Sequence, residues 1–562
     1  MLESELLKTV KDKRPIIWSI AGSDSGGGAG IQADLATIVD LDCHPCTVIS
    51  TITAQNTVSV DSVVSVDIEL FRSQIKTLAK DLYPDAIKIG LLGTQAQVNE
   101  VAEFLAVLNQ YQSKTKAVPV ILDPVMVASC GDVLATIRLD FTPLTGLITL
   151  ITPNGEELTK LVDGDEQPLL SIYQADNNQH QQLVDKALVL SKQMQCHVLV
   201  TGGDRSDVND IAEDIYVTAF VEGASVEHND SVFFLQSPKL DASYNHGTGC
   251  TLSTAIACFH ANHYVLHDAV VLAKAYVSKG LKYGYQSGNG KGCLARTSWP
   301  LELAFFPKIV QQSQSILANK KAFKPLNKPI GVYPVVDNLT LLQRLCEAGC
   351  TTVQLRIKQA DTNIIESSIA KAVLLGKEYN TQVFINDYWQ LAIKYQAFGV
   401  HLGQEDINTA DVEAIQSAGL ALGLSSHSYF EVLLAHQLQP SYIALGHIFT
   451  TNTKDMPSSP QGLKRLGKYA KLLNPHYPTV AIGGLNEDNL SQVSRTGVAS
   501  IAIVSAVTKA NDPSLAYVQL NKLWHHNQEQ SIKELADTRV NPTINDNASV
   551  ELDTLISGDV YA

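Results

Sequence analysis

The chain has 562 residues and carries 42 Lys and Arg against 57 Asp and Glu, so its formal net charge is −15 at pH 7. Proteins that grip nucleic acid by its phosphates normally have a basic surplus, and the acidic balance therefore argues against DNA or RNA as a partner. Hydrophobic residues make up 45% of the chain, which supplies buried cores and excludes wholesale disorder. At about 150 residues per domain, the length predicts two large domains or three to four ordinary ones.

Several features predict a cytoplasmic enzyme that binds no membrane. No segment approaches the ~18 apolar residues that a membrane-spanning helix requires. Glu3 and Glu5 near the N-terminus argue against a transit peptide. The nine cysteines are odd in number and scattered, unlike a secreted disulfide framework. Cys43 and Cys46 form a C-x-x-C pair without a second such pair, so we interpret them as buried packing thiols.

A change of composition between about residues 285 and 330 divides the chain. Residues 286–292 are rich in turn-forming residues, and residues 319–329 are rich in lysine and contain two prolines. Such clusters are typical of linkers. From residue 529 to 562 the chain has seven acidic and two basic residues, which indicates a solvated or loosely docked tail. We therefore expect domains at 15–290 and 329–525, a linker at 291–328 and an acidic tail at 526–562.

The first domain alternates apolar runs with helical patterns. The runs that predict strands are 16–22, 47–53, 86–92, 118–125, 147–152 and 197–202. Between the first two, Ile31, Leu35 and Ile38 recur at helical spacing. Such alternation predicts a mainly parallel sheet with helices on both faces, which is an α/β fold.

The second domain repeats the alternation more regularly. Eight apolar runs predict strands at 331–337, 351–357, 382–387, 399–403, 421–427, 442–449, 479–484 and 500–506. Helix-compatible segments separate them. Eight such units in a row predict a (β/α)8 barrel, also called a TIM barrel, whose active site lies at the carboxyl ends of the strands.

Polar residues collect at those predicted strand ends: Gln354, Arg356, Lys358, Asn386, Asp387, Asp406, Ser425, residues 450–454, Gly483, Gly484 and Ser505. Two carboxylates from neighbouring strands suit Mg²⁺, and clustered Arg and Lys suit a diphosphate. Each residue also has an ordinary alternative, since an Asp after a strand is commonly a helix cap and Gly-Gly is commonly a turn. Their coincidence along one rim favours a binding site.

The segments GVYPVVD, TTVQLRIK, FINDYWQLA, GVHLGQEDI, GLSSHS, TTNTK, VAIGGL and IAIVSA lie in this order between about residues 330 and 510. Together they resemble the thiamine-phosphate synthase family. The resemblance implies a barrel that joins 4-amino-2-methyl-5-hydroxymethylpyrimidine diphosphate to hydroxyethylthiazole phosphate and releases pyrophosphate.

The family's roles are carried over by motif. The residues implied to hold the pyrimidine diphosphate are Gln354, Leu355, Arg356, Ile357, Lys358, Asn386, Ser425 and Lys454. Those implied to hold the thiazole phosphate are Thr451, Asn452, Thr453, Gly483, Gly484, Val504 and Ser505. Asp387 and Asp406 are implied to bind Mg²⁺.

Two glycine-rich segments mark the first domain. Residues 21–30 (AGSDSGGGAG) follow the first predicted strand, and they match neither a Walker loop nor the Rossmann spacing. In residues 245–251 (NHGTGCT), Gly247 and Gly249 open an apolar helix, where free N–H groups and the helix dipole attract a phosphate. Cys250 would lie in the first turn, where the same effects predict a lowered thiol pKa.

The segments AGSDSGGGAGIQADL, TAQNT, KIGLL, ILDPVM, TPNGEE and HGTGCT resemble the hydroxymethylpyrimidine and phosphomethylpyrimidine kinases, a branch of the ribokinase superfamily, over about residues 15–290. The resemblance implies a ribokinase-like α/β sandwich that phosphorylates the pyrimidine alcohol, then its monophosphate, with ATP. It implies that Ala29, Asp34, Gln55 and Val125 contact the pyrimidine and that Asn154 and Glu157 help to place Mg–ATP. Gly247 and Gly249 would stabilise the transferring phosphoryl group, with Cys250 as the candidate base.

Two positions depart from that branch. Leu91 stands where Met is frequent, and Thr201 stands where a Lys before Gly-Gly is frequent. Since the kinase product is the barrel's substrate, we interpret the chain as a bifunctional thiamine-biosynthesis enzyme with small-molecule partners. Two alternatives remain open: a pyridoxal-type vitamin kinase fused to a thiazole-modifying barrel, and a protein with one degenerate, ligand-sensing half. Kinases of this branch are often dimers, which allows a homo-oligomer.

Overall fold

The computed structural model describes residues 14–110, 117–126, 139–163, 178–203, 210–219, 232–240, 242–311, 321–358, 361–451 and 459–540. Contacts divide the chain into two compact units, the first formed by residues 1–319 with 428–437 and the second by residues 320–427 with 438–562. Among the described residues, no helix combines the length and apolar character needed to cross a bilayer.

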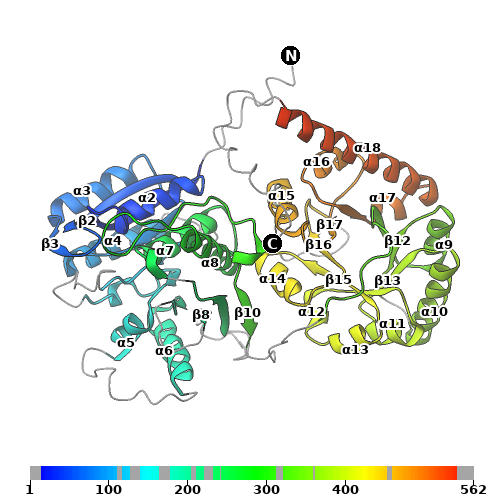
Figure 1. The fold of residues 1–562 in the computed structure, drawn as a ribbon, viewed down its shortest axis with the longest axis horizontal. Helices are drawn as coiled ribbons and strands as arrows, with labels where there is room; N and C mark the ends of the chain where they lie inside the picture. The colour runs from blue at the N-terminus through cyan, green and yellow to red at the C-terminus, as the bar shows by residue number, and fades with distance from the viewer. Residues whose placement is uncertain are drawn as a thin grey trace, which may run out of the picture. The chain divides into compact units, whose positions relative to one another are not determined.

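A ten-stranded sheet with the order β10-β9-β8-β7-β6-β5-β4-β1-β2-β3 forms the centre of the first unit (Figure 1). Its strands are β1 (Ile16–Ser23), β2 (His44–Gln55), β3 (Val60–Ser65), β4 (Ala86–Ile89), β5 (Val120–Leu122), β6 (Leu150–Ile151), β7 (His197–Val200), β8 (Ile211–Val217), β9 (Val232–Pro238) and β10 (Lys308–Gln311). Strands β1, β2 and β4–β7 are parallel, whereas β3 and β8–β10 pair antiparallel. The prediction of a mainly parallel α/β sheet is confirmed.

Helices cover both faces of this sheet. They are α2 (Gly30–Asp40), α3 (Ile68–Ala79), α4 (Gln95–Gln110), α5 (Gly155–Asp163), α6 (Asn178–Met194), α7 (Thr248–Ala261) and α8 (Leu266–Lys282), with short 3₁₀ turns at Thr142–Leu144, Ala242–Tyr244 and Leu303–Phe305. Helix α7 packs against both α2 and α8, and it is buried along most of its length because its sequence is apolar on every side. On the other face, Trp18 of β1 stacks on Phe104 of α4 at 5.4 Å between ring centroids.

The structure differs from the predicted linker and tail. Residues 308–311, inside the predicted linker, form β10 and pair with β9 of the first sheet. Residues 526–540, inside the predicted tail, continue helix α18 (Pro513–Val540). Trp524 of this helix is fully buried and Ser531 shares a hydrogen bond with Ser494 at 3.1 Å. The sequence did not reveal these elements, because charged and turn-forming residues surround the apolar ones in both segments.

The second unit contains a closed barrel of eight parallel strands, which confirms the predicted TIM barrel (Figure 1). The strands are β11 (Val332–Val336), β12 (Thr352–Leu355), β13 (Gln382–Asn386), β14 (Gly399–Leu402), β15 (Ala421–Ser426), β16 (Tyr442–Gly446), β17 (Thr479–Ile482) and β18 (Ser500–Ile503). The helices between and after them are α9 (Leu339–Glu347), α10 (Thr362–Glu378), α11 (Trp389–Tyr395), α12 (Gln404–Ile407), α13 (Val412–Ser417), α14 (Tyr429–Gln437), α15 (Gly462–Leu473), α16 (Leu490–Ser494), α17 (Ser505–Thr508) and α18. The segment that carries α14 is grouped with the first unit.

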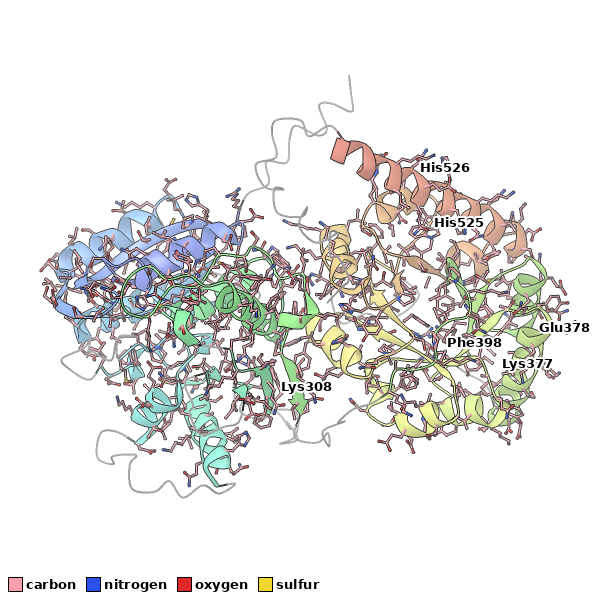
Figure 2. All side chains as sticks on the ribbon, in the orientation of Figure 1. Lys308, Lys377, Glu378, Phe398, His525 and His526 are labelled. Carbon is pink, nitrogen blue, oxygen red and sulfur yellow. The ribbon has the colours of Figure 1, made fainter. Side chains whose placement is uncertain are left out.

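Aromatic rings fill the barrel interior. Phe384 meets Tyr442 at 5.2 Å and Phe398 at 5.5 Å, both edge to face, and Tyr333 meets Tyr442 in the same way at 5.8 Å. Phe398 can be located by its label in Figure 2. Edge-to-face contacts of this kind add to the burial of apolar surface, so the interior is a packed core beneath the rim.

Candidate active sites

The glycine-rich turn after β1 is held by the buried carboxylate of Asp24. Its Oδ1 accepts a hydrogen bond from the N–H of Gly26 at 2.8 Å, and its Oδ2 accepts from Gly28 at 3.1 Å and from Ala29 at 2.9 Å. Burial alone raises the pKa of Asp24, but hydrogen bonds from His246 and the backbone outweigh it and hold the pKa below its ordinary value. Asp24 therefore shapes the turn as a carboxylate anion.

The second glycine-rich segment packs directly against this turn. The His246 Nε2 atom lies 3.1 Å from Asp24 Oδ2. Gly247, the N-cap of α7, has a φ of +82°, and a Cβ placed on it would overlap the carbonyl oxygen of Gly28. Only glycine allows both this backbone conformation and this close approach. The turn and the predicted phosphate-binding helix start are therefore built as one structure.

Two of the predicted pyrimidine residues lie at this turn. Gln55, at the end of β2, exchanges two hydrogen bonds with Ser25: its carbonyl oxygen accepts from Ser25 Oγ at 2.7 Å and its N–H donates back at 2.8 Å. Ala29 is the N-cap of α2. Val125 follows β5, where its N–H donates to the carbonyl oxygen of Asp123. The carboxyl ends of the parallel strands thus bring these residues to one edge of the sheet, and their contacts with a pyrimidine stay a prediction.

Asp34, the fourth predicted pyrimidine residue, has no exposed surface. Its two carboxylate oxygens lie 3.1 and 2.9 Å from Nζ of Lys88, which is equally buried on β4. Ser19 and Thr254 donate further hydrogen bonds to it at 2.6 and 2.7 Å. Every contact named here is internal, so in this structure Asp34 joins α2, β1, β4 and α7 rather than facing a ligand. A direct pyrimidine contact stays a prediction.

The prediction of a lowered pKa at Cys250 is wrong. Burial raises the pKa of the thiol to about 12, with Lys88 opposing the rise and Asp123 and Asp34 adding to it. Asp123 is itself buried beside this helix start: Ser253 donates to its Oδ2 at 3.2 Å, and burial raises the pKa of its carboxyl. The helix dipole favours a thiolate, but here desolvation in the first turn of α7 outweighs it.

Asn154 and Glu157, predicted to place Mg–ATP, cap the start of α5. The N–H of Asn154 donates to Glu157 Oε2 at 2.9 Å, and the N–H of Glu157 donates to Asn154 Oδ1 at 2.9 Å. This reciprocal pattern is a capping box, which stabilises the helix end. Thr201, which stands where a lysine is frequent in this branch of kinases, forms a parallel β-bridge with Asn154. It therefore lies beside the capping pair. The nucleotide role of both residues stays a prediction.

At the barrel rim, two carboxylates and a lysine lie together. Lys358 Nζ is 3.5 Å from Asp387 Oδ2. Burial raises the pKa of Asp387, the nearby Asp406 carboxylate raises it further, and Lys358 opposes both. Asp387 also has a φ of +65°, a conformation that costs energy in a residue with a Cβ and is common at functional sites. Two neighbouring carboxylates at a strand-end rim form a donor set that fits a divalent cation.

The remaining described residues of the predicted pyrimidine diphosphate set lie in or directly after strands β12, β13 and β15 of the barrel. Gln354 and Leu355 end β12, followed by Arg356 and Ile357, while Asn386 ends β13 and Ser425 lies in β15. Tyr388 donates to the carbonyl oxygen of Ile357 at 3.3 Å. Ser425 is half-buried, and its hydroxyl lies 2.8 Å from His401 Nε2.

Two loops of the predicted thiazole phosphate site meet at the same rim. Gly483 and Gly484 have φ angles of +104° and +69°, and a Cβ on Gly484 would lie 2.7 Å from the carbonyl oxygen of Thr450. Val504 is the N-cap of α17, which begins at Ser505. Glycine is required at both positions because the loops after β16 and β17 approach so closely. Thr451 is at the edge of this region, whereas Asn452, Thr453 and Lys454 lie outside the described residues.

Sequence reasoning missed six polar residues that organise the two sites: Asp24, Lys88, Asp123, His246, His401 and Tyr442. Most belong to motifs that were recognised, but no role was assigned to them. A lysine inside an apolar strand (AIKIG, residues 86–90) was a usable signal, because lysine is almost never fully buried unless it is paired.

The two units thus define a class of protein: an α/β phosphotransferase fold with two glycine-rich segments packed at a helix start, followed by a TIM barrel whose rim carries basic and acidic side chains. A family model described as phosphomethylpyrimidine kinase matches residues 24–295, and one described as thiamine monophosphate synthase matches residues 332–507.

Individual proteins are similar to this chain over part of its length. A thiamine-phosphate synthase from Yersinia pseudotuberculosis serotype O:1b (strain IP 31758) is 54% identical over 217 residues, covering 39% of this chain and 98% of that protein. A structure of pyridoxal kinase from Staphylococcus aureus with pyridoxal is 26% identical, covers 53% of this chain and 99% of that one, and has a TM-score of 0.41. A phosphomethylpyrimidine kinase structure from Clostridium difficile 630 is 29% identical, covers 47% and 98%, and has a TM-score of 0.35.

The chain belongs to the thiamine-phosphate synthase family through its barrel, and its first unit matches the phosphomethylpyrimidine kinase family model. It is a bifunctional transferase of thiamine biosynthesis.

Proposed function

We propose that the first unit transfers phosphate from ATP to the hydroxymethylpyrimidine and then to its monophosphate at the turn held by Asp24. Gln55, Ala29 and Val125 would hold the pyrimidine, and the N–H groups at Gly247 and Gly249 would meet the transferring phosphoryl group. The observation that carries this assignment is the direct packing of the glycine-rich turn against the start of α7. It supports a substrate hydroxyl and a phosphoryl group lying side by side. An activity that consumes ATP also supports the cytoplasm as its location.

The raised pKa of Cys250 argues against a thiolate that takes the proton from the substrate hydroxyl. With a pKa of about 12, Cys250 enters the reaction as a neutral thiol. Phosphoryl transfer passes through a loose transition state, in which the attacking hydroxyl keeps its proton until late. We infer that Sγ orients the substrate hydroxyl by a hydrogen bond and does not remove its proton in advance. Asn154 and Glu157 would lie beside the nucleotide.

In the barrel, the proposed task of the protein is to stabilise charge on departing pyrophosphate. Arg356 and Lys358 would bind the diphosphate with Asn386 and Ser425, and Gln354 would hold the pyrimidine. Asp387 and Asp406 would hold Mg²⁺, which neutralises diphosphate charge when bound. The thiazole nitrogen then captures the pyrimidine methyl cation, so no strong general base is needed. Gly483, Gly484 and Ser505 would hold the thiazole phosphate on backbone N–H groups.

A reconstitution of both reactions on the full chain tests the proposal. Hydroxymethylpyrimidine, ATP, Mg²⁺ and thiazole phosphate are supplied together, and thiamine phosphate and pyrophosphate are measured as each component is omitted in turn. We expect product only with the complete set. Supplying pyridoxal in place of hydroxymethylpyrimidine separates this proposal from a pyridoxal-type kinase. Absence of thiamine phosphate from the complete mixture would overturn it, and supplying synthetic pyrimidine diphosphate would show which unit failed.

A further inference from the structure

A chain of five polar side chains crosses the interior of the barrel beneath the rim. Gln354 Nε2 donates to the hydroxyl of Tyr333 at 3.1 Å, and the hydroxyls of Tyr333 and Tyr442 lie 2.9 Å apart. The hydroxyl of Tyr442 lies 2.7 Å from His401 Nδ1, and His401 Nε2 lies 2.8 Å from Ser425 Oγ. Both ends of this chain, Gln354 and Ser425, are predicted ligands of the pyrimidine diphosphate.

A hydrogen count assigns a direction to this chain. The hydroxyl of Tyr333 accepts from the Gln354 amide, so its single hydrogen goes to Tyr442. The hydrogen of Tyr442 then goes to His401 Nδ1, which is therefore an acceptor. The imidazole is thus neutral and carries its hydrogen on Nε2, from which it donates to Ser425 Oγ. The hydrogen of Ser425 is left for an acceptor in the half-buried rim.

Gly423 leaves the space that the Tyr442 side chain occupies in this hydrogen-bond network. Gly423 lies on β15 beside Tyr442 of the neighbouring strand, and a Cβ at Gly423 would overlap the Tyr442 ring and hydroxyl. Tyr333 and Tyr442 are almost fully buried, and His401 is 7% exposed. With the Gln354 amide nitrogen toward Tyr333, every hydrogen of this buried network has an acceptor, and reversing a single link would leave a polar group unpaired.

We propose that His401, Tyr442 and Tyr333 are positioning residues that keep the hydroxyl of Ser425 as a hydrogen-bond donor toward the diphosphate. This inference depends on the proposed contact between Ser425 and the diphosphate. A donor aimed at the leaving group stabilises the charge that accumulates as pyrophosphate departs, so it acts more strongly in the transition state than in the bound substrate.

The test is a set of variants in the full chain, assayed for pyrophosphate release with synthetic pyrimidine diphosphate and thiazole phosphate. Ser425→Ala should lower kcat about 100-fold, as expected for loss of a transition-state donor. His401→Leu should lower kcat about 30-fold, within the range for a residue that orients a ligand group, while KM changes little. His401→Gln keeps an amide donor at the Nε2 position and should retain kcat within about threefold. Tyr442→Phe should lower kcat about fivefold through loss of one hydrogen bond.

The decisive comparison places each variant on the Ser425→Ala background. If the hydrogen-bonded side chains act through Ser425, His401→Leu and Tyr442→Phe should lower kcat no further on the Ser425→Ala background. A packing role instead predicts the same loss in both backgrounds. Tyr517→Phe, the same substitution at a buried tyrosine of α18, serves as the matched control and should leave kcat unchanged. Thermal unfolding confirms that each variant is folded, and Tyr333→Phe replaces Tyr442→Phe if the latter is not.

Two results separate the possible failures. If Ser425→Ala retains wild-type kcat, the proposed diphosphate contact is wrong, and the inference fails with it. If Ser425→Ala lowers kcat while His401→Leu retains it, or while the two losses multiply, the contact stands and the positioning role of His401 is overturned.

Discussion

Replacement of Lys88 by methionine tests how the buried charge pair supports the kinase site. Lys88 and Asp34 both have fully buried side chains, and Nζ of Lys88 lies 3.1 and 2.9 Å from the two carboxylate oxygens. Desolvation alone lowers the pKa of Lys88, but the Asp34 carboxylate outweighs it and the pKa is raised. Methionine has a similar volume and no charge, so Lys88→Met leaves a buried carboxylate without its counter-charge.

The structure allows the cost of this change to be worked out. Removing one partner of a buried ion pair costs about 3–5 kcal/mol. Asp34 keeps hydrogen bonds from Ser19 and Thr254, so we expect the lower end, about 3 kcal/mol. At about 2–4 °C per kcal/mol for a large domain, the unfolding midpoint of the first unit should fall by about 6–12 °C. The double variant Lys88→Met with Asp34→Asn should recover most of this loss, because it leaves no unpaired charge.

Differential scanning calorimetry of the full chain measures the shift, with thiamine-phosphate synthase activity as an internal control for the barrel. Lys76→Met, which removes an exposed lysine from α3 of the same unit, is the matched control and should leave the midpoint unchanged. A midpoint for Lys88→Met within about 1 °C of wild type would show that the unpaired Asp34 carboxylate does not destabilise the first unit. So would a double variant as unstable as the single one, because the unpaired charge would then not be the cause.

Three further predictions concern the two sites. Asp387→Ala should abolish thiamine phosphate formation and leave pyrimidine phosphorylation intact; coupling that persists at saturating Mg²⁺ would contradict the metal assignment. Cys250→Ala should lower phosphorylation about 100-fold through loss of substrate positioning, with an unchanged unfolding midpoint, and unchanged turnover would reduce Cys250 to a packing residue. Asp24→Asn should destabilise the first unit at pH 7. Because the native pKa of Asp24 lies below its ordinary value of 3.8, this stabilisation is present above pH 3.8 and is lost as the pH falls through the native pKa. Urea unfolding of both proteins should therefore converge in acid, and a difference that persists there would assign the loss to packing.

The positions of the barrel strands, and the edge at which the polar residues gather, could be predicted from the amino-acid sequence alone. The eight apolar runs correspond to β11–β18, because buried parallel strands require continuous apolar segments. The set of residues at the rim could be predicted because the carboxyl ends of parallel strands meet on one side of a barrel. Thus Asp387, Asp406 and Lys358 were grouped correctly without coordinates.

The pairing of polar groups in the interior, by contrast, depends on long-range packing that the sequence pattern does not reveal. The predicted ligand Asp34 is paired with Lys88, 54 residues away, and no local pattern reports such a contact. The pKa of Cys250 depends on desolvation by distant segments, which reversed an expectation drawn from the helix start alone. The antiparallel strand β10 likewise depends on its partner β9. Periodicity encodes which face of an element is buried, whereas the partner of each buried charge or hydroxyl is set by long-range packing, and it is that packing which aligns His401 with Ser425.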